Sequence, residues 1–260
     1  MLDIIIVSFN CRDVLAGCLR SLASAPPLRP HRIVVVDNGS TDGTVAYVRA
    51  SHPEVHVIEP GGNIGFAAAN NIAIRATAGD LVLLLNPDTV VTPAAIDRLC
   101  QALESSSRAG VAGPRIVDGT GRAELSFGRM LSPLNEWRQK RRTAEWIATE
   151  TAREQVVDWV SGACLLVHRA DAERAGLLDE RFFLYTEDVD FCHAVRRQGR
   201  KVLFTPVATI THLRGRSRAS RPEASQRAYR ASHVAFYEKH HPFWAPVLKL
   251  YLRMRREWPA

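Results

Sequence analysis

Polar and acidic side chains stand at the ends of short apolar runs in the first third of the chain. Ser8 and Asn10 follow an Ile- and Val-rich run, Asp37 ends a second run, and Asp88 follows Leu81–Leu85. Short continuous runs of this kind are typical of buried parallel strands. Ligands of doubly wound α/β proteins bind at the carboxyl ends of such strands. The sequence therefore predicts a ligand site built from these side chains.

Asp37 is followed by Asn-Gly-Ser-Thr-Asp-Gly, a turn-forming segment that ends the strand. A carboxylate fixed there can accept hydrogen bonds from a ribose hydroxyl or from the edge of a base. Ser40, Thr41 or Asp42 can in addition cap the helix that follows. We expect Asp37 to bind a ligand, with capping by its neighbours as the alternative role of the segment.

Asn86-Pro87-Asp88 ends the most apolar strand of the chain. A carboxylate and an amide at one strand end could hold a hard cation that bridges diphosphate oxygens, because magnesium is often bound by one or two carboxylates plus substrate phosphates. Asn-Pro-Asp is also an ordinary turn sequence. The motif alone leaves both interpretations open.

A glycine-containing segment precedes this strand, Gly-Gly-Asn-Ile-Gly-Phe-Ala-Ala-Ala-Asn-Asn at 61–71. Its glycines do not form G-x-G-x-x-G, and the first strand-to-helix turn, at 10–12, contains no glycine. A nicotinamide-dependent enzyme is therefore disfavoured. The glycines would instead let the backbone approach a ligand, and Asn70 would lie one turn into the helix that follows.

Two further features of the second half could take part in chemistry. Glu187, Asp188 and Asp190 open a helix. The helix macrodipole stabilises acidic residues in a first turn, but three acids in four positions exceed that need. His212 ends an apolar strand, where a lone histidine can be either structural or a metal ligand.

The elements that must position these residues follow from hydrophobic periodicity. Over the first part of the chain, strand patterns alternate with helical ones, which predicts a doubly wound α/β sheet over roughly the first 110 residues. The expected strands are 3–9, 33–37, 56–58 and 81–85, and the expected helices are centred on 14–22, 44–49 and 66–78.

The second part of the chain is less regular. The irregularity is confined to 111–135, and 136–155 is charged and helical in character. After these, we expect a strand at 159–167, helices near 169–175 and over 187–198, and strands at 202–204 and 208–211.

Composition indicates an ordinary folded protein. The 260 residues are 46% hydrophobic and 23% charged, with a net charge of +7. The apolar runs are too short for a transmembrane helix, and the start of the chain lacks the features of a signal peptide. Five scattered cysteines without a C-x-x-C pair indicate neither a disulfide framework nor a zinc knuckle. We therefore expect a cytoplasmic location.

The positive charge is concentrated at the C-terminal end. Residues 214–256 contain eleven Lys and Arg against two Glu, a local charge of +9. Apolar residues at 244, 247, 248, 251 and 252 recur at helical spacing. Such a segment could lie on an anionic membrane surface, or it could pack on the body of the protein as a closing helix.

Taken together and in this order, the segments resemble inverting family 2 glycosyltransferases of the GT-A fold, in their rhamnosyltransferase-like branch. The resemblance covers about residues 3–213 and rests on I-I-V-S-F-N (5–10), V-V-D-N-G-S-T-D-G-T (35–44), N-I-G-F-A-A-A-N-N (63–71), L-L-N-P-D (84–88), W-V-S-G-A-C-L-L-V (159–167), D-E-R-F-F-L-Y-T-E-D-V-D-F (179–191) and His212. It implies an α/β fold with a Rossmann-like, mostly parallel central sheet flanked by helices, followed by a helical basic tail.

The resemblance also implies roles for individual residues. Those placed around the nucleotide sugar are Ser8, Asn10, Asp37, Asn63, Gly65, Asn70, Asn86 and Asp88. Asn86-Pro87-Asp88 stands where the family has a D-x-D metal motif, with Asn86 in place of the first Asp. Asp88 and His212 would then hold Mg²⁺ or Mn²⁺.

On the acceptor side, the resemblance implies that Trp159, Gly162 and Glu187 face the acceptor and that Asp188 is the catalytic base. Residues 1–213 would form the catalytic domain, with a nucleotide-sugar half over about 1–110 and an acceptor half over 111–213. Residues 214–260 would form a basic amphipathic tail that is able to meet an anionic membrane surface at the inner face of the cell membrane.

The expected function is metal-dependent, inverting transfer of a sugar to a hydroxyl of a cell-surface glycan or a lipid-linked acceptor. The resemblance favours L-rhamnose from dTDP-rhamnose, with UDP-hexoses and UDP-galactofuranose as other donors. The alternative is a non-catalytic α/β scaffold with a polyanion-binding tail. Polar groups at three strand ends and an acidic helix start favour the enzyme, and the tail has no recognisable nucleic-acid-binding motif.

Overall fold

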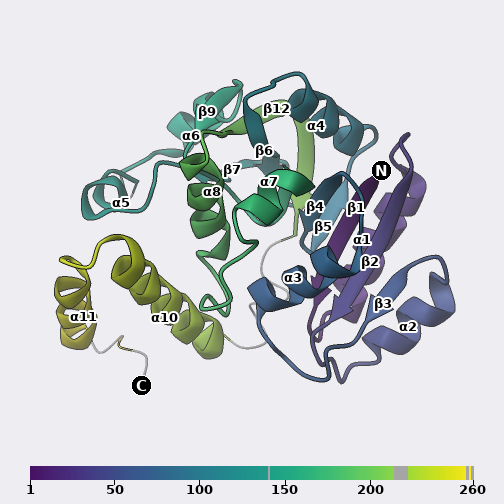
Figure 1. Cartoon of the computed structure of the whole chain (residues 1–260), viewed down its shortest axis with the longest axis horizontal. Coiled ribbons are helices and arrows are strands. Elements are labelled where there is room, and N and C mark those ends of the chain that lie inside the picture. The colour runs from purple at the N-terminus through teal and green to yellow at the C-terminus, as the bar shows by residue number, and fades with distance from the viewer. Residues whose placement is uncertain (140, 214–221, 256–257, 259–260) are drawn as a thin grey trace.

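The fold is a twisted central sheet with helices on both faces, as the computed structural model in Figure 1 shows. The structure describes residues 1–139, 141–213, 222–255 and 258. The strands of the main sheet are β1 (Leu2–Ser8), β2 (His31–Asp37), β3 (His56–Ile58), β4 (Leu81–Leu85), β5 (Thr89–Val91), β6 (Ala109–Val117), β7 (Ala123–Glu124), β9 (Gln155–Val157), β11 (Cys164–His168) and β12 (Lys201–His212). A small second sheet pairs β8 (Phe127–Gly128) with β10 (Trp159–Val160).

Two sets of helices cover the two faces of the sheet. One set is α1 (Arg12–Ser24), α2 (Thr44–Ser51) and α4 (Ala95–Glu104), and the other is α3 (Phe66–Ala76), α7 (Arg169–Arg174) and α8 (Glu187–Arg197). Alternate residues of β1 enter the two cores, with Ile4 in the first and Ile5 in the second. The strand is apolar throughout because both of its faces are buried.

The order of strands is β3-β2-β1-β4-β11-β6-β12-β5. The first four are parallel, and so are β6 and β12, whereas β11 runs antiparallel between β4 and β6. The expected central sheet flanked by helices is confirmed. Its parallel order is confined to these two stretches, so the sheet as a whole is mixed.

Several expected elements are confirmed, and others need correction. The strands at 56–58 and 81–85 have the predicted bounds, and β1, β2, α1, α2 and α3 differ only at their ends. Most of β6, an interior strand of the sheet, lies in the segment 111–135, where the sequence pattern is irregular. The helical pattern over 136–155 is two short helices, α5 (Pro133–Gln139) and α6 (Ala144–Glu150), because the Thr143 hydroxyl accepts a hydrogen bond from the Trp146 N–H and starts a new helix.

The expected strand at 159–167 is divided into β10 and β11. The Cys164 N–H donates to the Ser161 carbonyl at 3.2 Å, which closes a turn over 161–163. In contrast, the strands expected at 202–204 and 208–211 are one strand, β12. Its pairing with β6 shifts register between Thr205 and Thr209, around Pro206, which has no N–H to donate to the ladder.

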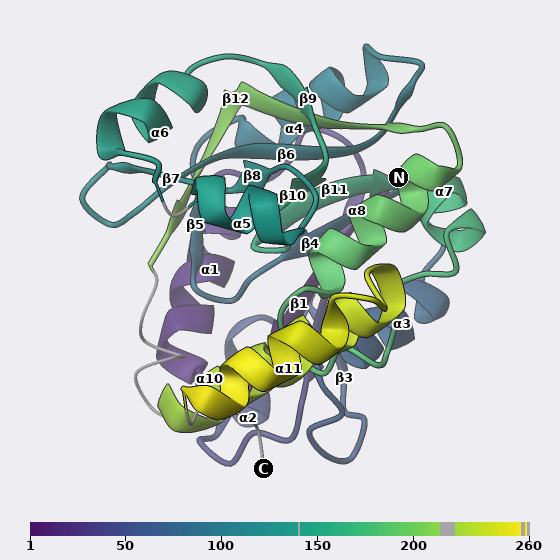
Figure 2. The same cartoon turned by 90° about the vertical axis from the view of Figure 1, so that its left-hand side faces the viewer.

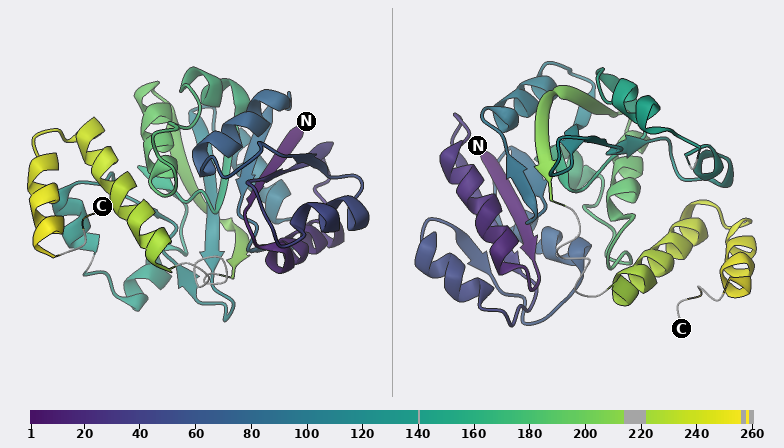
Figure 3. Two further views of the ribbon diagram at one scale, coloured as in Figure 1. Left: turned by 90° about the horizontal axis from the view of Figure 1, so that it is seen from below. Right: turned by 180° about the vertical axis from the view of Figure 1, so that it is seen from behind.

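The C-terminal segment forms α10 (Pro222–His240) and α11 (Ala245–Met254) on the side of the molecule remote from β2, β3 and α2 (Figure 3). Phe236 and Tyr237 of α10 are buried in a third core with Phe182 and Val189. α10 therefore packs on the body of the protein, whereas the periodic stripe for which packing was the alternative belongs to α11. On α11, Leu252 is buried but most of the other apolar side chains are exposed. No helix in the described part of the chain combines the length and apolar character that crossing a membrane requires.

The same sheet runs through both expected halves of the catalytic domain. The division into a nucleotide-sugar half over about 1–110, an acceptor half over 111–213 and a tail over 214–260 stays a prediction. Residues 214–221 lie outside the described part of the chain.

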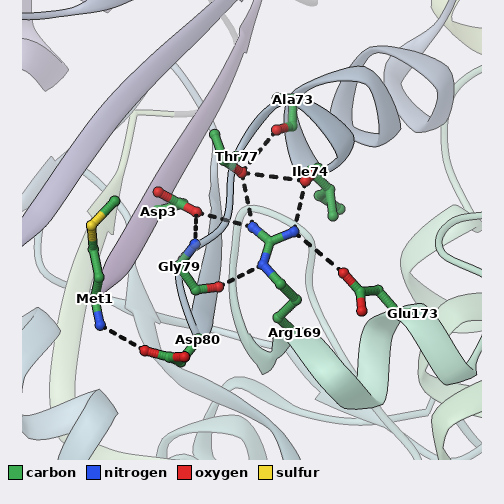
Figure 4. Close-up of polar contacts among 9 residues, drawn as sticks. All are labelled: Met1, Asp3, Ala73, Ile74, Thr77, Gly79, Asp80, Arg169 and Glu173. Carbon is green, nitrogen blue, oxygen red and sulfur yellow. Dashed lines mark hydrogen bonds and ion pairs between the residues drawn. The ribbon is translucent and has the colours of Figure 1, made fainter.

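A buried ion pair joins the two parts of the sheet at the amino ends of β1 and β4 (Figure 4). Arg169 donates to the Asp3 carboxylate at 3.0 Å, to the Thr77 hydroxyl at 2.8 Å and to the Ile74 carbonyl at 2.7 Å. The Gly79 N–H donates to the same Asp3 oxygen at 2.6 Å. Arg169 follows β11 directly, so this cluster fixes β11 against β1 and the end of α3.

Arg169→Ala should lower the free energy of unfolding by about 3–5 kcal/mol, because it leaves a buried carboxylate without its cation. Urea-induced unfolding measures the change. Arg75→Ala is the matched control, since Arg75 makes an exposed ion pair with Glu180 and should cost about 1 kcal/mol or less. Equal losses in the two variants would contradict a central role for the Arg169 cluster.

Candidate active site

Asp37 and Ser8 lie side by side at the carboxyl ends of β2 and β1, where the parallel register pairs them directly. Both side chains are buried. One oxygen of Asp37, Oδ2, accepts the Ser40 N–H at 2.8 Å, whereas Oδ1 is buried with no hydrogen-bond partner within the described residues. Buried polar atoms are almost always hydrogen-bonded. The Asp37 carboxylate thus retains one hydrogen-bond acceptor that no described residue uses.

Asn10 holds the loop that follows β2. Its backbone N–H donates to the Ser40 hydroxyl at 2.8 Å, and its Oδ1 accepts the Thr41 N–H at 2.7 Å. Its φ of 49° places it in the left-handed region, which Asn tolerates better than most residues. The side chain of Asn10 therefore shapes the loop beside Asp37.

Asn38 connects the end of β2 to the glycine-containing loop, and sequence reasoning missed it. Its Nδ2 donates to Asn63 Oδ1 at 3.0 Å and to the Gly65 carbonyl at 3.2 Å, and its Oδ1 accepts the Ile64 N–H at 3.0 Å. The only sequence signal was its position next to Asp37. Asn63 and Gly65 are thereby brought to the edge of the sheet that carries Asp37.

Gly65 directly precedes α3, and Asn70 lies one turn into that helix. Gly65 has a φ of 89°, and a Cβ there would lie 2.7 Å from the Phe183 carbonyl oxygen, so the position requires glycine. Asn70 is buried and donates to the Phe66 carbonyl at 2.9 Å. Its Oδ1 has no hydrogen-bond partner within the described residues, like Asp37 Oδ1.

The structure brings Asp88 and His212 together, although they lie on different segments. Asp88 Oδ1 and His212 Nε2 are 3.0 Å apart and both side chains are buried. The pairing of Thr89 in β5 with His212 in β12 fixes this contact. Glu124 Oε2 lies 3.8 Å from His212 Nδ1. Asn86 donates its backbone N–H to the Ala163 carbonyl at 2.9 Å, and its side chain is half-buried.

A carboxylate oxygen and an imidazole nitrogen that converge in this way fit a divalent cation such as Mn²⁺ or Mg²⁺. Among the described residues there is no group of three or more His, Cys, Asp and Glu side chains arranged for a metal ion. The remaining ligands of such a cation would therefore come from other groups, such as the oxygens of a bound diphosphate or of water.

Asp188 is fixed from two sides at the start of α8. Its Oδ2 accepts the Gly162 N–H at 2.8 Å and its Oδ1 accepts the Val189 N–H at 2.8 Å. Burial raises the pKa of Asp188, and the two hydrogen bonds oppose the rise. The turn over 161–163 contacts both Asp188 and Asn86, so it connects the two groups of acidic residues.

The other two acids of this helix start have different surroundings. Glu187 is buried, and burial together with the neighbouring Asp188 raises its pKa well above the usual range. Its Oε2 has no hydrogen-bond partner in the described part of the chain. Asp190 instead turns to α10, where it binds His240 at 2.6 Å and Lys239 at 2.8 Å. Asp190 is therefore structural.

A strained turn precedes Glu187, and α10 holds it in place. Tyr185 and Thr186 have φ values of 71° and 64°, a conformation that costs of order 1–3 kcal/mol for each non-glycine residue. The Ser232 hydroxyl donates to the Leu184 carbonyl at 2.8 Å, and the ring of Tyr229 packs edge-on against Tyr185. Sequence patterns do not indicate this support, because the two segments are far apart in the chain.

The remaining expected acceptor residues come from β10 and the turn after it. The Trp159 indole N–H donates to the Arg129 carbonyl at 2.9 Å, and its ring lies against Gly128. Gly162 lies against Asp188, since a Cβ at Gly162 would be 3.3 Å from the Cβ of Asp188. The structure thus places Gly162 and Asp188 in direct contact, with Trp159 three residues before Gly162.

The chain is similar to known glycosyltransferases. The family described as "Glycosyltransferase like family 2" matches residues 2–231. The chain is 30% identical to an N-acetylglucosaminyl-diphospho-decaprenol L-rhamnosyltransferase of Mycobacterium tuberculosis, over 97% of this chain and 89% of the relative. It is 27% identical to the low-salt glycan biosynthesis hexosyltransferase Agl10 of Haloferax volcanii, over 81% of this chain and 66% of that protein.

Similar solved structures include two complexes with Mn²⁺. The mannosyltransferase PcManGT from Pyrobaculum calidifontis with GDP-Man and Mn²⁺ superposes with a TM-score of 0.65 at 18% identity, covering 95% of this chain and 67% of that one. GalNAc-T7 with UDP, GalNAc and Mn²⁺ superposes with a TM-score of 0.64 at 19% identity, covering 90% of this chain and 48% of that one. These similarities establish the GT-A fold.

Glu187→Gln should flatten the dependence of stability on pH. The raised pKa means that the folded protein binds the Glu187 proton more tightly than the unfolded chain does. The free energy of unfolding therefore falls as the pH rises from the ordinary carboxyl pKa towards the raised one. Urea unfolding at about pH 5 and about pH 8 should show a smaller decline in Glu187→Gln than in the wild type.

The exposed Glu54→Gln is the control for this comparison, and it should decline with pH as the wild type does. If Glu187→Gln and Glu54→Gln had the same pH dependence, Glu187 would not be the buried acid that the structure describes.

Proposed function

The chain belongs to family 2 of the glycosyltransferases, and from this we propose that it moves one sugar, with inversion, from a nucleoside diphosphate to a hydroxyl group of a lipid-linked or cell-surface glycan. The observation that carries the proposal is Asp188, a carboxylate with a raised pKa that the Gly162 N–H holds in place. It lies across the turn at 161–163 from Asn86, at the edge of the sheet that also carries Asp37. Membership of a glycosyltransferase family favours an enzyme over the alternative of a non-catalytic scaffold.

The donor is bound along the ends of β1, β2 and β4. Asp37 Oδ1 and Asn70 Oδ1, which have no hydrogen-bond partner among the described residues, would accept hydrogen bonds from the nucleotide sugar. Ser8 lies at the base of this donor site and Asn10 shapes the loop beside Asp37. Asn63 and Gly65 line the opposite side of the donor site. The favoured donor is dTDP-L-rhamnose, because the relative from Mycobacterium tuberculosis is a rhamnosyltransferase. UDP-hexoses and UDP-galactofuranose are the other candidates.

Asp88 and His212 would hold the divalent cation, with Asn86 beside them. When bound, Mg²⁺ or Mn²⁺ supplies positive charge for the diphosphate oxygens of the donor. Support for this assignment comes from the converging oxygen and nitrogen atoms, and from the Mn²⁺ in two proteins of the same fold.

Transfer requires one base. The acceptor hydroxyl oxygen forms a bond to the anomeric carbon, the bond from that carbon to the diphosphate breaks, and the hydroxyl proton moves to the Asp188 carboxylate. Attack from the face opposite the leaving diphosphate inverts the configuration. The Gly162 N–H orients the carboxylate. The raised pKa brings the basicity of Asp188 closer to the neutral pH at which it must accept the proton.

The acceptor is placed over Trp159, Gly162 and Glu187. The partly exposed ring of Trp159 offers a flat apolar surface to a sugar, and a protonated Glu187 can donate a hydrogen bond. A polyprenyl diphosphate-linked sugar is the proposed acceptor class, because the name of the mycobacterial relative specifies one. Such an acceptor places the enzyme at the inner face of the cell membrane.

Asp188→Asn should reduce the transfer rate by about 10²-fold or more, because it removes the base and barely changes the volume. Donor binding, measured by calorimetry, should change little. The exposed Asp13→Asn is the control. Near-normal turnover in Asp188→Asn together with an inactive Glu187→Gln would assign the base to Glu187 instead.

Nucleotides should raise the melting temperature more with Mn²⁺ than with a chelator, and His212→Ala should require more Mn²⁺ for the same shift. A thermal-shift series with dTDP, UDP and GDP would also identify the nucleotide. His56→Ala is the control, since His56 is exposed on β3. The metal assignment fails if the chelator leaves the shift unchanged, or if His212→Ala lowers the melting temperature of the free protein without altering the Mn²⁺ dependence of the shift.

A further inference from the structure

More than half of the exposed large apolar side chains in the described part of the chain gather on two segments. Leu134 and Trp137 belong to α5, and the others lie between Phe243 and Met254, in and just before α11. Phe243 is 92% exposed and Met254 is 69% exposed. The full set is Leu134, Trp137, Phe243, Trp244, Val247, Leu250, Tyr251 and Met254. Soluble monomers rarely expose contiguous apolar patches of this kind without a use for them.

The two segments form one surface, which we call the α5–α11 face. Ser132, Pro133, Leu134 and Trp137 line an open groove together with Trp244. Figure 1 places α5 and α11 on the same side of the molecule, and Figure 2 views that side directly. α11 packs on the body through Ala245, Leu248 and Leu252. Its exposed apolar residues take no part in this packing.

Basic side chains accompany this face. The Arg141 guanidinium lies 3.7 Å from the centre of the Trp137 ring, and Arg253 lies 5.0 Å from the ring of Trp258. Residues 243–255 contain no carboxylate. The one carboxylate of α5, Glu136, turns inward to accept a hydrogen bond from the Tyr237 hydroxyl at 2.6 Å. Lys249 of α11 forms an ion pair with Glu238 of α10. The face is therefore apolar with a surplus of basic residues, because the carboxylate of α5 turns inward and Glu238 is paired.

We propose that the α5–α11 face binds the surface of an anionic lipid bilayer. A helix with exposed Trp and Leu residues and basic neighbours lies in the plane of a membrane interface, where aromatic rings sit at the level of the headgroups. Arg and Lys near the surface gain energy from anionic lipids. The charge of the face decides for a bilayer and against an apolar protein partner, which would not need the arginines.

The face borders the acceptor side of the candidate active site. Trp159 packs on the same apolar cluster as Met130 and Leu131, which come just before α5, and as Leu248 of α11. Binding through this face would therefore turn the acceptor side towards the bilayer. This consequence rests on the proposed function, because it serves a lipid-linked acceptor, whereas membrane binding itself does not depend on it.

The structure also changes which part of the C-terminal segment meets the membrane. Phe236 and Tyr237 of α10 are buried against the body, so α10 is not available for lipid. The contact is made by α11 together with α5, which lies outside the tail.

Flotation of the full chain with vesicles tests the proposal. The protein should bind vesicles of phosphatidylcholine with phosphatidylglycerol at low salt, bind pure phosphatidylcholine weakly, and dissociate as the salt concentration rises. The double variant Phe243→Glu/Leu250→Glu should lose about tenfold or more of its binding, since it places charge in the apolar contact. Its matched control is Leu28→Glu/Val207→Glu, which changes two similarly exposed apolar residues elsewhere and should bind as the wild type does.

The charge contribution is tested separately. Arg138→Gln/Arg141→Gln should weaken binding to the anionic vesicles, whereas Arg98→Gln/Arg108→Gln, at exposed positions away from the face, should not. Both double variants at the face should retain hydrolysis of the donor nucleotide sugar in solution, because neither touches the candidate site. Failure of the membrane proposal would thus be distinguishable from failure of the proposed function.

Three results would overturn the proposal. The first is no binding to anionic vesicles at low salt, and the second is unchanged binding in Phe243→Glu/Leu250→Glu. The third is a dimer in sedimentation velocity that this variant dissociates, which would make the face an interface between copies of the chain.

Discussion

The buried ion pair between Asp3 and Arg169 fixes the arrangement on which the site depends. Arg169 directly follows the last residue of β11, so its hydrogen bonds to Asp3 and Thr77 hold that end of the strand against β1 and α3. The antiparallel register then places Cys164 opposite Leu85, at the other end. For this reason the turn at 161–163 lies beside Asn86 and gives its Gly162 N–H to Asp188. Separating the partners of such a pair would leave a buried charge uncompensated, so the pair favours the arrangement in which Asp3 and Arg169 meet.

The site is also marked by what its side chains leave unsatisfied. The loops around it are held by their own hydrogen bonds, as Asn38 shows in connecting β2 to Asn63. Within the described residues, three buried oxygens at the candidate site, Asp37 Oδ1, Asn70 Oδ1 and Glu187 Oε2, have no such partner. An unpaired buried polar atom costs about 1–3 kcal/mol. A ligand that donates hydrogen bonds to these atoms would recover that energy.

The parts of this molecule that sequence could predict are those encoded locally. Apolar runs located β1, β2 and β4, and the polar residues after them located Ser8, Asp37 and Asp88. The contact of Asp88 with His212 was expected only through a family resemblance, because it depends on how β5 and β12 pair. β6 was missed because its glycines and proline weaken the apolar pattern that burial within the sheet requires. Asn38 and the support from α10 were missed because both act through tertiary contacts.

The contact between Gly65 and Phe183 has a consequence for the order of events on the enzyme. The Phe66 N–H donates to the Phe183 carbonyl at 2.7 Å, and no side chain separates Gly65 from that carbonyl. The loop assigned to the donor therefore rests directly on the segment that leads to Glu187. A ligand that moves the loop at Gly65 would also move the segment at Phe183. Each substrate would then change the affinity for the other, and such coupling is reciprocal. The two substrates would then bind interdependently, and a compulsory order of addition would be the kinetic expression of this single backbone contact.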